Sequence, residues 1–419
     1  PRWSTGRRRR RIATCVAPAD KAGWRRVAPV GATGVLIRVI RPHHGAGERN
    51  RGTAITGRCL VAATDTRAGQ APLHVAESGV MNATPAPYPR LVADIGGTNA
   101  RFALVEAPGA APTHLRALRC AEHSGPEAAL RAWLADTGAR LPAYAAFGIA
   151  TPIDGDGVAM TNHPWRFSIG ALCGALGLRR LTVVNDFTAL ALALLALGDG
   201  DLVRVGGGEP RAGAARALIG AGTGLGVSGL LPVPGGWVPL QGEGGHVTLP
   251  ASCTREAAVV AWLAARHGHV SAERVLSGPG LVVLHDTLRA LDGEARVERT
   301  PAEISERALA GGCRHCVEAL ELFCALLGTV AGDVALTLGA RGGLYIGGGI
   351  VPRLGDFFLR SAFRERFVAK GRFRPWLERI PIWVVVAPHA ALTGASAALD
   401  SAIELGFTTL AEPRGHVSP

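Results

Sequence analysis

The sequence predicts a mixed α/β protein, and two patterns carry that prediction. Between residues 91 and 150, apolar strands are followed by an amphipathic helix and a further buried strand, which is an α/β order. A unit of strand, glycine turn and strand also occurs twice, as LVADIGGTNARFAL from Leu91 and as ALIGAGTGLGVSGLL from Ala217. The 419 residues are long enough for two or three domains.

The first glycine hairpin has the composition of a cradle for phosphate and metal. Gly96 and Gly97 permit close backbone approaches, and unpaired N–H groups in such a turn bind anions. Thr98 and Asn99 add side-chain donors, and Asp94 ends the strand where its carboxylate can hold Mg²⁺ directly or through water. An ordinary hairpin with a Gly-Gly turn is the alternative for this stretch taken alone.

Apolar periodicity predicts the next elements. We expect strands over Leu115–Cys120 and Tyr144–Ala150, with a helix over Pro126–Ala139 between them. The following stretch, TPIDGDGVAMTNHPWRFS, is a long loop with a short hairpin that carries Asn162 and Trp165. Loops of this length at the end of a strand usually line a site, although a plain surface loop is the alternative.

A carboxylate follows the next buried strand. Leu181–Val184 ends in Asn185 and Asp186 and passes directly into an apolar helix. Because α/β sheets bind ligands at the carboxyl ends of their strands, Asp186 is a candidate general base. Capping the helix is the alternative role for the same residue.

The second glycine hairpin has Gly222, Thr223 and Gly224 in its turn, and facing the first it would hold a polyphosphate from both sides. A dinucleotide-binding turn is the rival, but the spacing is GxGxGxG and the turn leads into a strand. Glu243 and His246 then occur in GEGGH. Ionised carboxylates suit the hydroxyls of a small polyol, whereas metal ligation by this pair lacks a third ligand at recognisable spacing.

The rest of the chain alternates helix and strand. Helices are expected between Pro301 and Ala340, followed by the strand GGLYI, which ends in three glycines that would let a flat ring lie against backbone. Pro352 opens the next helix. A last strand, Pro381–Ala387, precedes the small-residue helix ALTGASAALDSAIELG.

Basic charge is concentrated in residues 1 to 80. The net charge is +12, but this segment holds 15 of the 45 basic and 4 of the 33 acidic residues, so the remainder is nearly neutral. The segment lacks a sustained apolar period, and we expect it to be mostly disordered or marginal. A nucleic-acid arm or an arginine-rich targeting peptide is one interpretation; upstream sequence ahead of a start at Met81 is the one we prefer.

The spacing of the eight cysteines does not indicate a disulfide framework. Cys313 and Cys316 are a lone CxxC within an expected helical run, without a second pair at zinc spacing, so we expect a structural or incidental role. A reduced, cytoplasmic protein follows. No run of 18 or more apolar residues occurs, so we expect no membrane span.

The order of the motifs closely resembles that of the bacterial glucokinase family, in the actin/hexokinase superfamily. The resemblance covers about Leu91–Gly406 and rests on DIGGTNARFAL, TNHPWRFS, VNDFTA, GAGTGLGV, GEGGHV, ERVLSGPG and GGLYIGGGIVPR. A neighbouring group, the ROK family, carries a cysteine-rich zinc loop after its Glu-His motif. Here EGGHV is followed by a single Cys253, which argues against a zinc-dependent relative.

The resemblance implies a kinase that phosphorylates glucose from ATP with Mg²⁺, with Asp186 taking the proton of the 6-hydroxyl. It implies that the sugar is bound by Asn162, Asn185, Asp186, Glu243, His246 and Glu273. It implies that Asp94 holds Mg²⁺ through water, and that ATP is bound by Ala93, Asp94, Ile95, Gly96, Gly97, Thr98, Asn99, Gly222, Thr223, Gly224, Gly347, Gly348 and Gly349.

The resemblance also implies a two-domain actin-like/hexokinase fold of ribonuclease-H-like domains, with the active site in the cleft between them. We expect a small domain of residues 88–195 plus 388–406 and a large domain of residues 196–387, after a basic extension of residues 1–85. A homodimer is implied, and neither membrane nor nucleic acid is expected as a partner. The alternative function is a sugar-sensing transcriptional regulator with a basic DNA-binding arm, but the arm has no recognisable helix-turn-helix pattern.

Overall fold

The computed structural model describes residues 24–26, 36–38, 85–401 and 407–410, and the chain divides into two compact units. The first unit, Pro1–Ser78, contains the antiparallel strands β1 (Trp24–Arg26) and β2 (Leu36–Arg38). Most of the basic segment, and the expected start at Met81, lie outside the described residues. The second unit, Gly79–Pro419, carries every predicted site residue.

Six strands form the first sheet of the second unit, in the order β16-β9-β6-β3-β4-β5. The hairpin expected from Leu91 is confirmed as the antiparallel pair β3 and β4, while β3, β6 and β9 run parallel. β5 and β16 pair antiparallel at the two edges. The strands are β3 (Arg90–Ile95), β4 (Asn99–Val105), β5 (Thr113–Arg119), β6 (Tyr144–Ile149), β9 (Arg180–Asn185) and β16 (Phe407–Leu410).

The second sheet repeats this topology in the order β10-β15-β14-β11-β12-β13. An antiparallel run of β11, β12 and β13 lies on one side, and β14 and β15 continue parallel to β11 on the other. β10 is the edge strand beside β15 and runs antiparallel to it. β16 has the same position beside β9 in the first sheet. The strands are β10 (Leu202–Gly206), β11 (Arg216–Ala221), β12 (Leu225–Val233), β13 (Gly236–Pro239), β14 (Leu344–Gly347) and β15 (Ile382–Val385).

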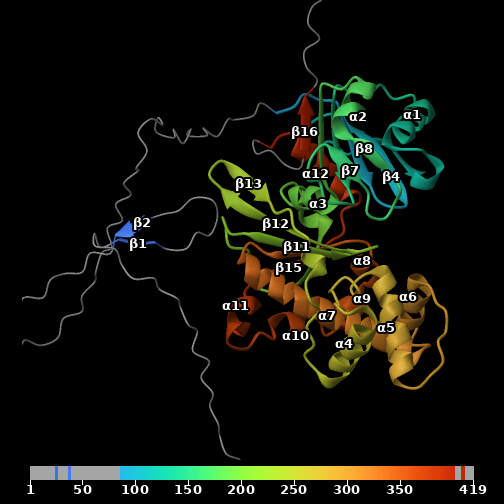
Figure 1. The fold of residues 1–419 in the computed structure, drawn as a ribbon, viewed down its shortest axis with the longest axis vertical. Helices are drawn as coiled ribbons and strands as arrows, with labels where there is room; N and C mark the ends of the chain where they lie inside the picture. The colour runs from blue at the N-terminus through green and yellow to red at the C-terminus, as the bar shows by residue number, and fades with distance from the viewer. Residues whose placement is uncertain (1–23, 27–35, 39–84, 402–406, 411–419) are drawn as a thin grey trace, which may run out of the picture. The chain divides into compact units, whose positions relative to one another are not determined.

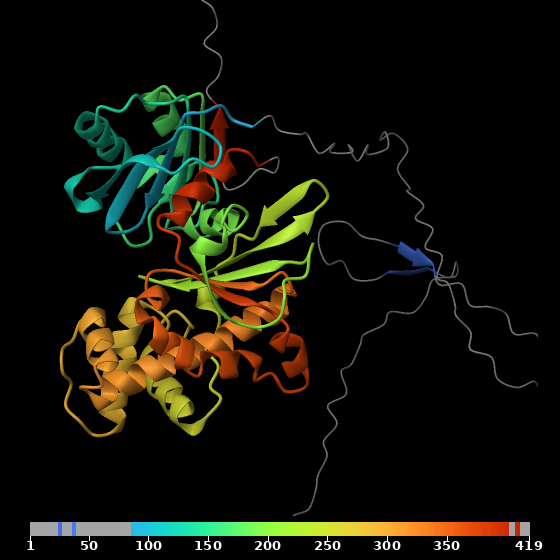
Figure 2. The same ribbon diagram turned by 180° about the vertical axis from the view of Figure 1, so that it is seen from behind.

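Two helices lie between the sheets (Figures 1 and 2). α3 (Asp186–Ala193) continues directly from β9, and α12 (Ala390–Ala398) packs along it. The contact is close because both helices are rich in small residues. One apolar core joins the facing sides of the two sheets through these helices, and it includes Val92, Ala146, Ala189, Leu218, Tyr345 and Ala395.

The outer face of the first sheet is covered by α1 (Pro126–Thr137) and α2 (Ile169–Leu176). Trp133 of α1 is fully buried against Phe102, with ring centroids 6.1 Å apart. The expected helix from Pro126 is thereby confirmed. The loop before α2 contains the expected short hairpin, formed by β7 (Gly157–Ala159) and β8 (Arg166–Ser168).

Helices surround the other face of the second sheet, with α7 at their centre (Figure 1). Of the described helices, α7 is long and apolar enough to cross a membrane, but 72% of that window is buried inside the protein, as expected for a core helix. The helices are α4 (Thr254–His267), α5 (Gly278–Leu291), α6 (Pro301–Leu309), α7 (Arg314–Leu338), α8 (Val351–Leu354), α9 (Asp356–Arg360), α10 (Phe363–Val368) and α11 (Arg374–Glu378).

Candidate active site

Asp94 and Asp186 lie at the carboxyl ends of β3 and β9, which are parallel strands separated only by β6. Gly148 of β6 lies opposite Asp94 in the register. A Cβ added to Gly148 would lie 3.2 Å from the Cβ of Ala189 and 3.6 Å from the Cα of Asp186. The glycine therefore lets α3 begin close to the sheet, on the side where Asp94 emerges.

The electrostatic setting of Asp186 suits a base. Its pKa is raised to about 6, first by burial and then by the negative charge of Asp94, with Glu243 adding to the rise. Hydrogen bonds from backbone N–H groups oppose the shift. Glu243 belongs to the segment after β13, so residues of the second sheet's half act on the same carboxylate.

Asp94 is held by a cation on the neighbouring strand. Its Oδ2 accepts a hydrogen bond from Nη1 of Arg101 at 3.0 Å. Burial raises the pKa of Asp94, and the charges of Arg101 and His389 oppose that rise. His389 has a left-handed backbone (φ 58°) and immediately precedes α12, so the C-terminal part of the chain also reaches the end of β3.

Asn185, rather than Asp186 alone, caps α3. Its Oδ1 accepts hydrogen bonds from the N–H groups of Phe187 (2.9 Å) and Thr188 (3.3 Å), and its Nδ2 donates to the Thr151 carbonyl at 3.3 Å. Asp186 Oδ1 also accepts from Phe187 N–H, at 2.9 Å. The Asn185 amide is thus already engaged by the protein, and its predicted sugar contact stays a prediction.

The first hairpin turn is closed and lies against the long loop. The Gly96 N–H donates to the Asn99 carbonyl at 2.9 Å, so this N–H serves the turn and not a phosphate. A Cβ on Gly97 would lie 2.9 Å from the Asn162 carbonyl oxygen, so only glycine allows this approach. The structure therefore brings exposed Asn162 beside the turn.

The second hairpin forms a hydrogen bond with Glu273, a residue predicted to bind the sugar. Glu273 Oε2 accepts a hydrogen bond from the Leu225 N–H, directly after the hairpin turn, at 2.9 Å. The Glu273 N–H in turn donates to the Gly245 carbonyl at 2.9 Å. The Gly278 N–H donates to the Gly222 carbonyl at 2.8 Å, which joins the turn to the start of α5.

Glu243, His246 and Glu273, which the resemblance implies as sugar-binding residues, lie close together in one polar cluster. The His246 Nε2 lies 3.8 Å from Glu243 Oε2 and 4.0 Å from Glu273 Oε1. The first two side chains are 57% exposed and Glu273 is 33% exposed, so ligand hydroxyls can reach them. Within the described chain, their ligand atoms do not converge as a metal group.

The three glycines at the end of β14, Gly347–Gly349, lie beside the second hairpin. Gly348 has a left-handed backbone (φ 78°), and a Cβ there would lie 2.3 Å from the Ala221 carbonyl oxygen. A Cβ on Gly347 would lie 2.6 Å from Leu190 of α3. The glycine strand end, the second hairpin and the helix that begins at Asp186 thus meet in one place. Gly349 has open space around it.

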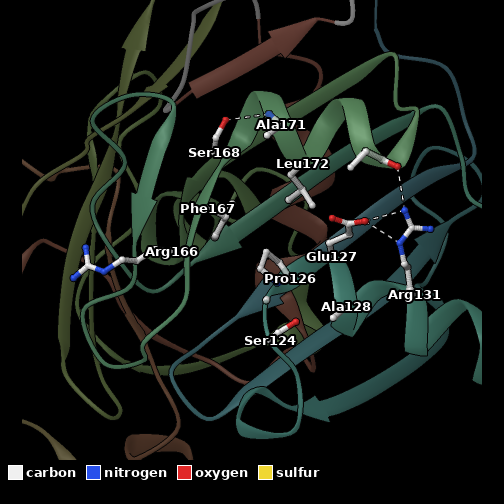
Figure 3. A pocket seen from close by; sticks show the side chains of 12 residues that line it. Ser124, Pro126, Glu127, Ala128, Arg131, Arg166, Phe167, Ser168, Ala171 and Leu172 are labelled. Carbon is white, nitrogen blue, oxygen red and sulfur yellow. Dashed lines mark hydrogen bonds and ion pairs between the residues drawn. The ribbon is translucent and has the colours of Figure 1, made fainter.

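A separate hollow of about 590 Å³ lies between the first turns of α1 and α2 (Figure 3). Glu127 and Arg131 form an ion pair at its edge (2.8 Å), and Ser168 caps α2 there. The described lining includes none of the predicted site residues. We assign the chemistry to the converging carboxylates instead, because this hollow brings together no comparable set of titratable groups.

Sequence reasoning missed Gly148 and His389. Gly148 sits inside a buried apolar strand, where a glycine has no pattern of its own. His389 reaches Asp94 only because the chain returns to the first half after β15. The single available signal was the short loop APHA between the last predicted strand and helix.

The Glucokinase family model matches residues 91–402 of this chain. The chain belongs to the glucokinase family. A glucokinase of Aromatoleum aromaticum is 58% identical over 317 residues, which cover 75% of this chain and 96% of that protein. The family match and the motifs thus agree on where the enzyme lies in the chain.

Solved structures of glucokinases, one of them from the ROK family, share the fold. A glucokinase from an Antarctic psychrotroph is 36% identical, with a TM-score of 0.68 over 75% of this chain and 99% of its own. A ROK family glucokinase from Streptomyces griseus, in complex with glucose and AMPPNP, has a TM-score of 0.51 at 20% identity, over 74% of this chain and 98% of its own. The expected actin-like/hexokinase fold is confirmed.

Proposed function

We propose that this hexose kinase transfers the γ-phosphoryl group of ATP to the 6-hydroxyl of glucose, with Asp186 taking the hydroxyl proton. The position of Asp186 carries the proposal: it starts α3 at the end of β9, and its pKa is raised to about 6. A general base works best with a pKa near the working pH. Ionised at neutral pH, Asp186 accepts the proton as the oxygen attacks phosphorus.

We infer that the sugar binds at the polar cluster of Glu243, His246 and Glu273, with Asn162 and Asn185 beside it. The hydrogen bond from Leu225 N–H occupies one oxygen of Glu273, which leaves Oε1 toward His246 for a hydroxyl donor. Carboxylates bind such donors with short, strong hydrogen bonds. The Streptomyces griseus relative was solved with glucose and AMPPNP, which supports glucose and ATP as the substrates here.

We infer that the two glycine hairpins hold the ATP phosphates and that Gly347–Gly349 hold the adenosine. The carboxylate oxygens of Asp94 and Asp186 fit Mg²⁺, because that ion prefers hard carboxylate and water ligands. The negative charge of Asp94 raises the pKa of Asp186, which supports a cation here because a cation would relieve the repulsion. Asp94 already binds Arg101 through Oδ2, so its other oxygen would hold a metal-bound water. Bound Mg²⁺ supplies charge neutralisation at the phosphates.

We infer that residues 88–195 plus 388–406 and residues 196–387 form two halves that close around the substrates. The strands of each sheet support this division, except that β16 (Phe407–Leu410) of the first sheet lies beyond residue 406. The homodimer rests on the resemblance and the cytoplasmic location rests on the spread of the cysteines, and both stay predictions. The sugar-sensing regulator is not favoured, because the chain matches kinases across residues 91–402.

The test is a coupled assay with ATP and a panel of hexoses. Asp186→Asn should lower kcat by roughly 10² to 10⁴ with little change in sugar binding, since a positioned base contributes about that much. In the unchanged protein, kcat should rise with pH through about 6 and then level off, because the base must be ionised. Asp199→Asn, at an exposed aspartate in the turn before β10, is the matched control. Near-normal kcat in Asp186→Asn would remove Asp186 from the role.

A further inference from the structure

Two thiols and an imidazole meet on the side of α7, outside the candidate active site. Cys313, Cys316 and His285 each offer one ligand atom, and these atoms all lie within 4.8 Å of one another. The CxxC pair was expected inside a helix, but Cys313 is the N-cap of α7 and Cys316 lies in its first turn. The third member comes from α5, which sequence spacing alone did not connect to the pair.

His285 is buried with one ring nitrogen free. Its side chain is 0% exposed, and its Nδ1 lies 3.1 Å from Asp286 Oδ1, which is itself joined through Oδ2 to Arg296. Among the described residues, Nε2 has no hydrogen-bond partner. Buried polar atoms are rarely left unpaired, because the lost hydration costs free energy. A histidine held by a carboxylate at one nitrogen and free at the other has the arrangement of a metal ligand.

The two thiols differ in access and in acidity. Cys316 is fully buried, whereas Cys313 is partly exposed at the helix start, where the helix dipole favours a thiolate. Burial opposes ionisation of Cys313, but hydrogen bonds from Cys316 and from the backbone outweigh it and lower the pKa. Burial and the neighbouring Cys313 raise the pKa of Cys316 to about 12. Binding a cation here would therefore displace the Cys316 proton.

We propose that Cys313, Cys316 and His285 bind one zinc ion, with water in the fourth position, and that the ion joins α5 to the start of α7. Two sulfur ligands and an imidazole select Zn²⁺ over Mg²⁺, which prefers oxygen. The site shares no residue with the predicted active site. It would close the loop that contains α6, so its effect is on stability and not on the phosphoryl transfer step.

The test uses the full chain, stripped of metal and kept reduced with a phosphine. Added equimolar Co²⁺ should give a thiolate-to-cobalt charge-transfer band in the near ultraviolet, and Zn²⁺ should displace it. Cys316→Ser and His285→Gln should lose the band. Cys324→Ala is the matched control, because Cys324 is a buried cysteine of the same helix outside the cluster, and it should keep the band. Zinc should also raise the Tm of the unchanged chain but not that of Cys316→Ser.

Three results would overturn the zinc site. The first is the absence of a cobalt band in the unchanged chain, and the second is a band that survives in both ligand variants. The third is a Cys313–Cys316 disulfide in the isolated protein, together with no zinc binding after that disulfide is reduced. If Cys316→Ser does not fold, Cys313→Ser replaces it, because Cys313 is the partly exposed member of the pair. That variant should likewise lose the cobalt band and the rise in Tm with zinc.

Discussion

At the scale of single residues, burial and neighbouring negative charge destabilise the ionised form of Asp186 in the candidate site. The folded pKa of Asp186 is about 6, against 3.8 for an unperturbed aspartate, so folding favours the protonated form. For an acid with a raised pKa, stability is greatest at low pH and falls as the pH rises from about 4 to about 6. Above that range the full cost of the ionised Asp186 is present.

Asp186→Asn should therefore stabilise the protein while it removes activity. A shift from 3.8 to about 6 corresponds to as much as about 3 kcal/mol at pH 8, and to little at pH 4. The Asn oxygen can still accept the Phe187 N–H, so the helix start is kept. Thermal unfolding of both proteins at pH 4 and pH 8 measures the difference. A Tm at pH 8 equal to or below that of the unchanged protein would contradict this destabilisation.

Residues of the site could be predicted where the sequence marked them locally. Asp94 and Asp186 stand out because each ends an apolar strand, and Glu243 stands out among glycines. Gly148 and His389 could not be found this way, because they act only across strands or after the chain returns from the second sheet.

At the scale of elements, apolar periodicity predicted the central strands and α1 but missed the short edge strands. β10 and β16 have five and four residues, and β10 has no buried residue, so no alternation of buried and exposed positions marks it. The helical run expected around the CxxC is present as α7, but the sequence did not indicate that Cys313 is its N-cap. A cap depends on local backbone geometry, which an apolar pattern does not resolve.

A buried ion pair joins α4 to α10. Glu256, 1% exposed, accepts hydrogen bonds from Arg366 at 2.6 and 3.0 Å. Burial opposes ionisation of Glu256, but Arg366 and the Ser252 N–H outweigh it and lower the pKa. For an acid with a lowered pKa, the contribution to stability is present above the unfolded value of 4.5 and is lost as the pH falls through the folded value.

Glu256→Gln should lower the free energy of unfolding by roughly 3 to 5 kcal/mol at pH 7, because it leaves Arg366 without its buried partner. The difference should shrink as the pH falls from 4.5 through the lowered pKa of Glu256. Glu318→Gln is the control, since Glu318 pairs with Arg255 in a partly exposed position and should cost no more than about 1 kcal/mol. Thermal unfolding at pH 7 and pH 4 compares the variants. Equal Tm changes for the two variants at pH 7 would contradict the larger contribution to stability that we expect from the Glu256–Arg366 pair.

At the scale of the whole kinase unit, the two sheets have the same topology and the chain passes between them twice. The passages lie between α3 and β10 and between β15 and α12. They are joined where the N–H groups of Val386 and Ala387 both donate to the Asp201 carbonyl, at 2.8 and 3.2 Å. We expect two adjacent passages of this kind to act as a hinge. The order of motifs predicted the fold class, but only the structure shows that the passages touch.

Glucose should close the two halves about this hinge, because an open site would leave water free to accept the phosphoryl group. Small-angle X-ray scattering of the full chain should show a smaller radius of gyration with glucose than without it. An equal concentration of sucrose controls for the effect of solute. Identical scattering profiles with and without glucose would count against closure.

The apolar helix α7 has a consequence for synthesis of the protein. It leaves the ribosome well before β15 and α10, which complete the core around it. During that interval, a segment with the length and composition of a membrane span lacks the partners that follow it in the chain, although α5 and α6 precede it. Exposed apolar surface of this kind promotes aggregation and capture by chaperones. The helix at the centre of the second half's core is therefore open to such interactions until β15 and α10 have been made.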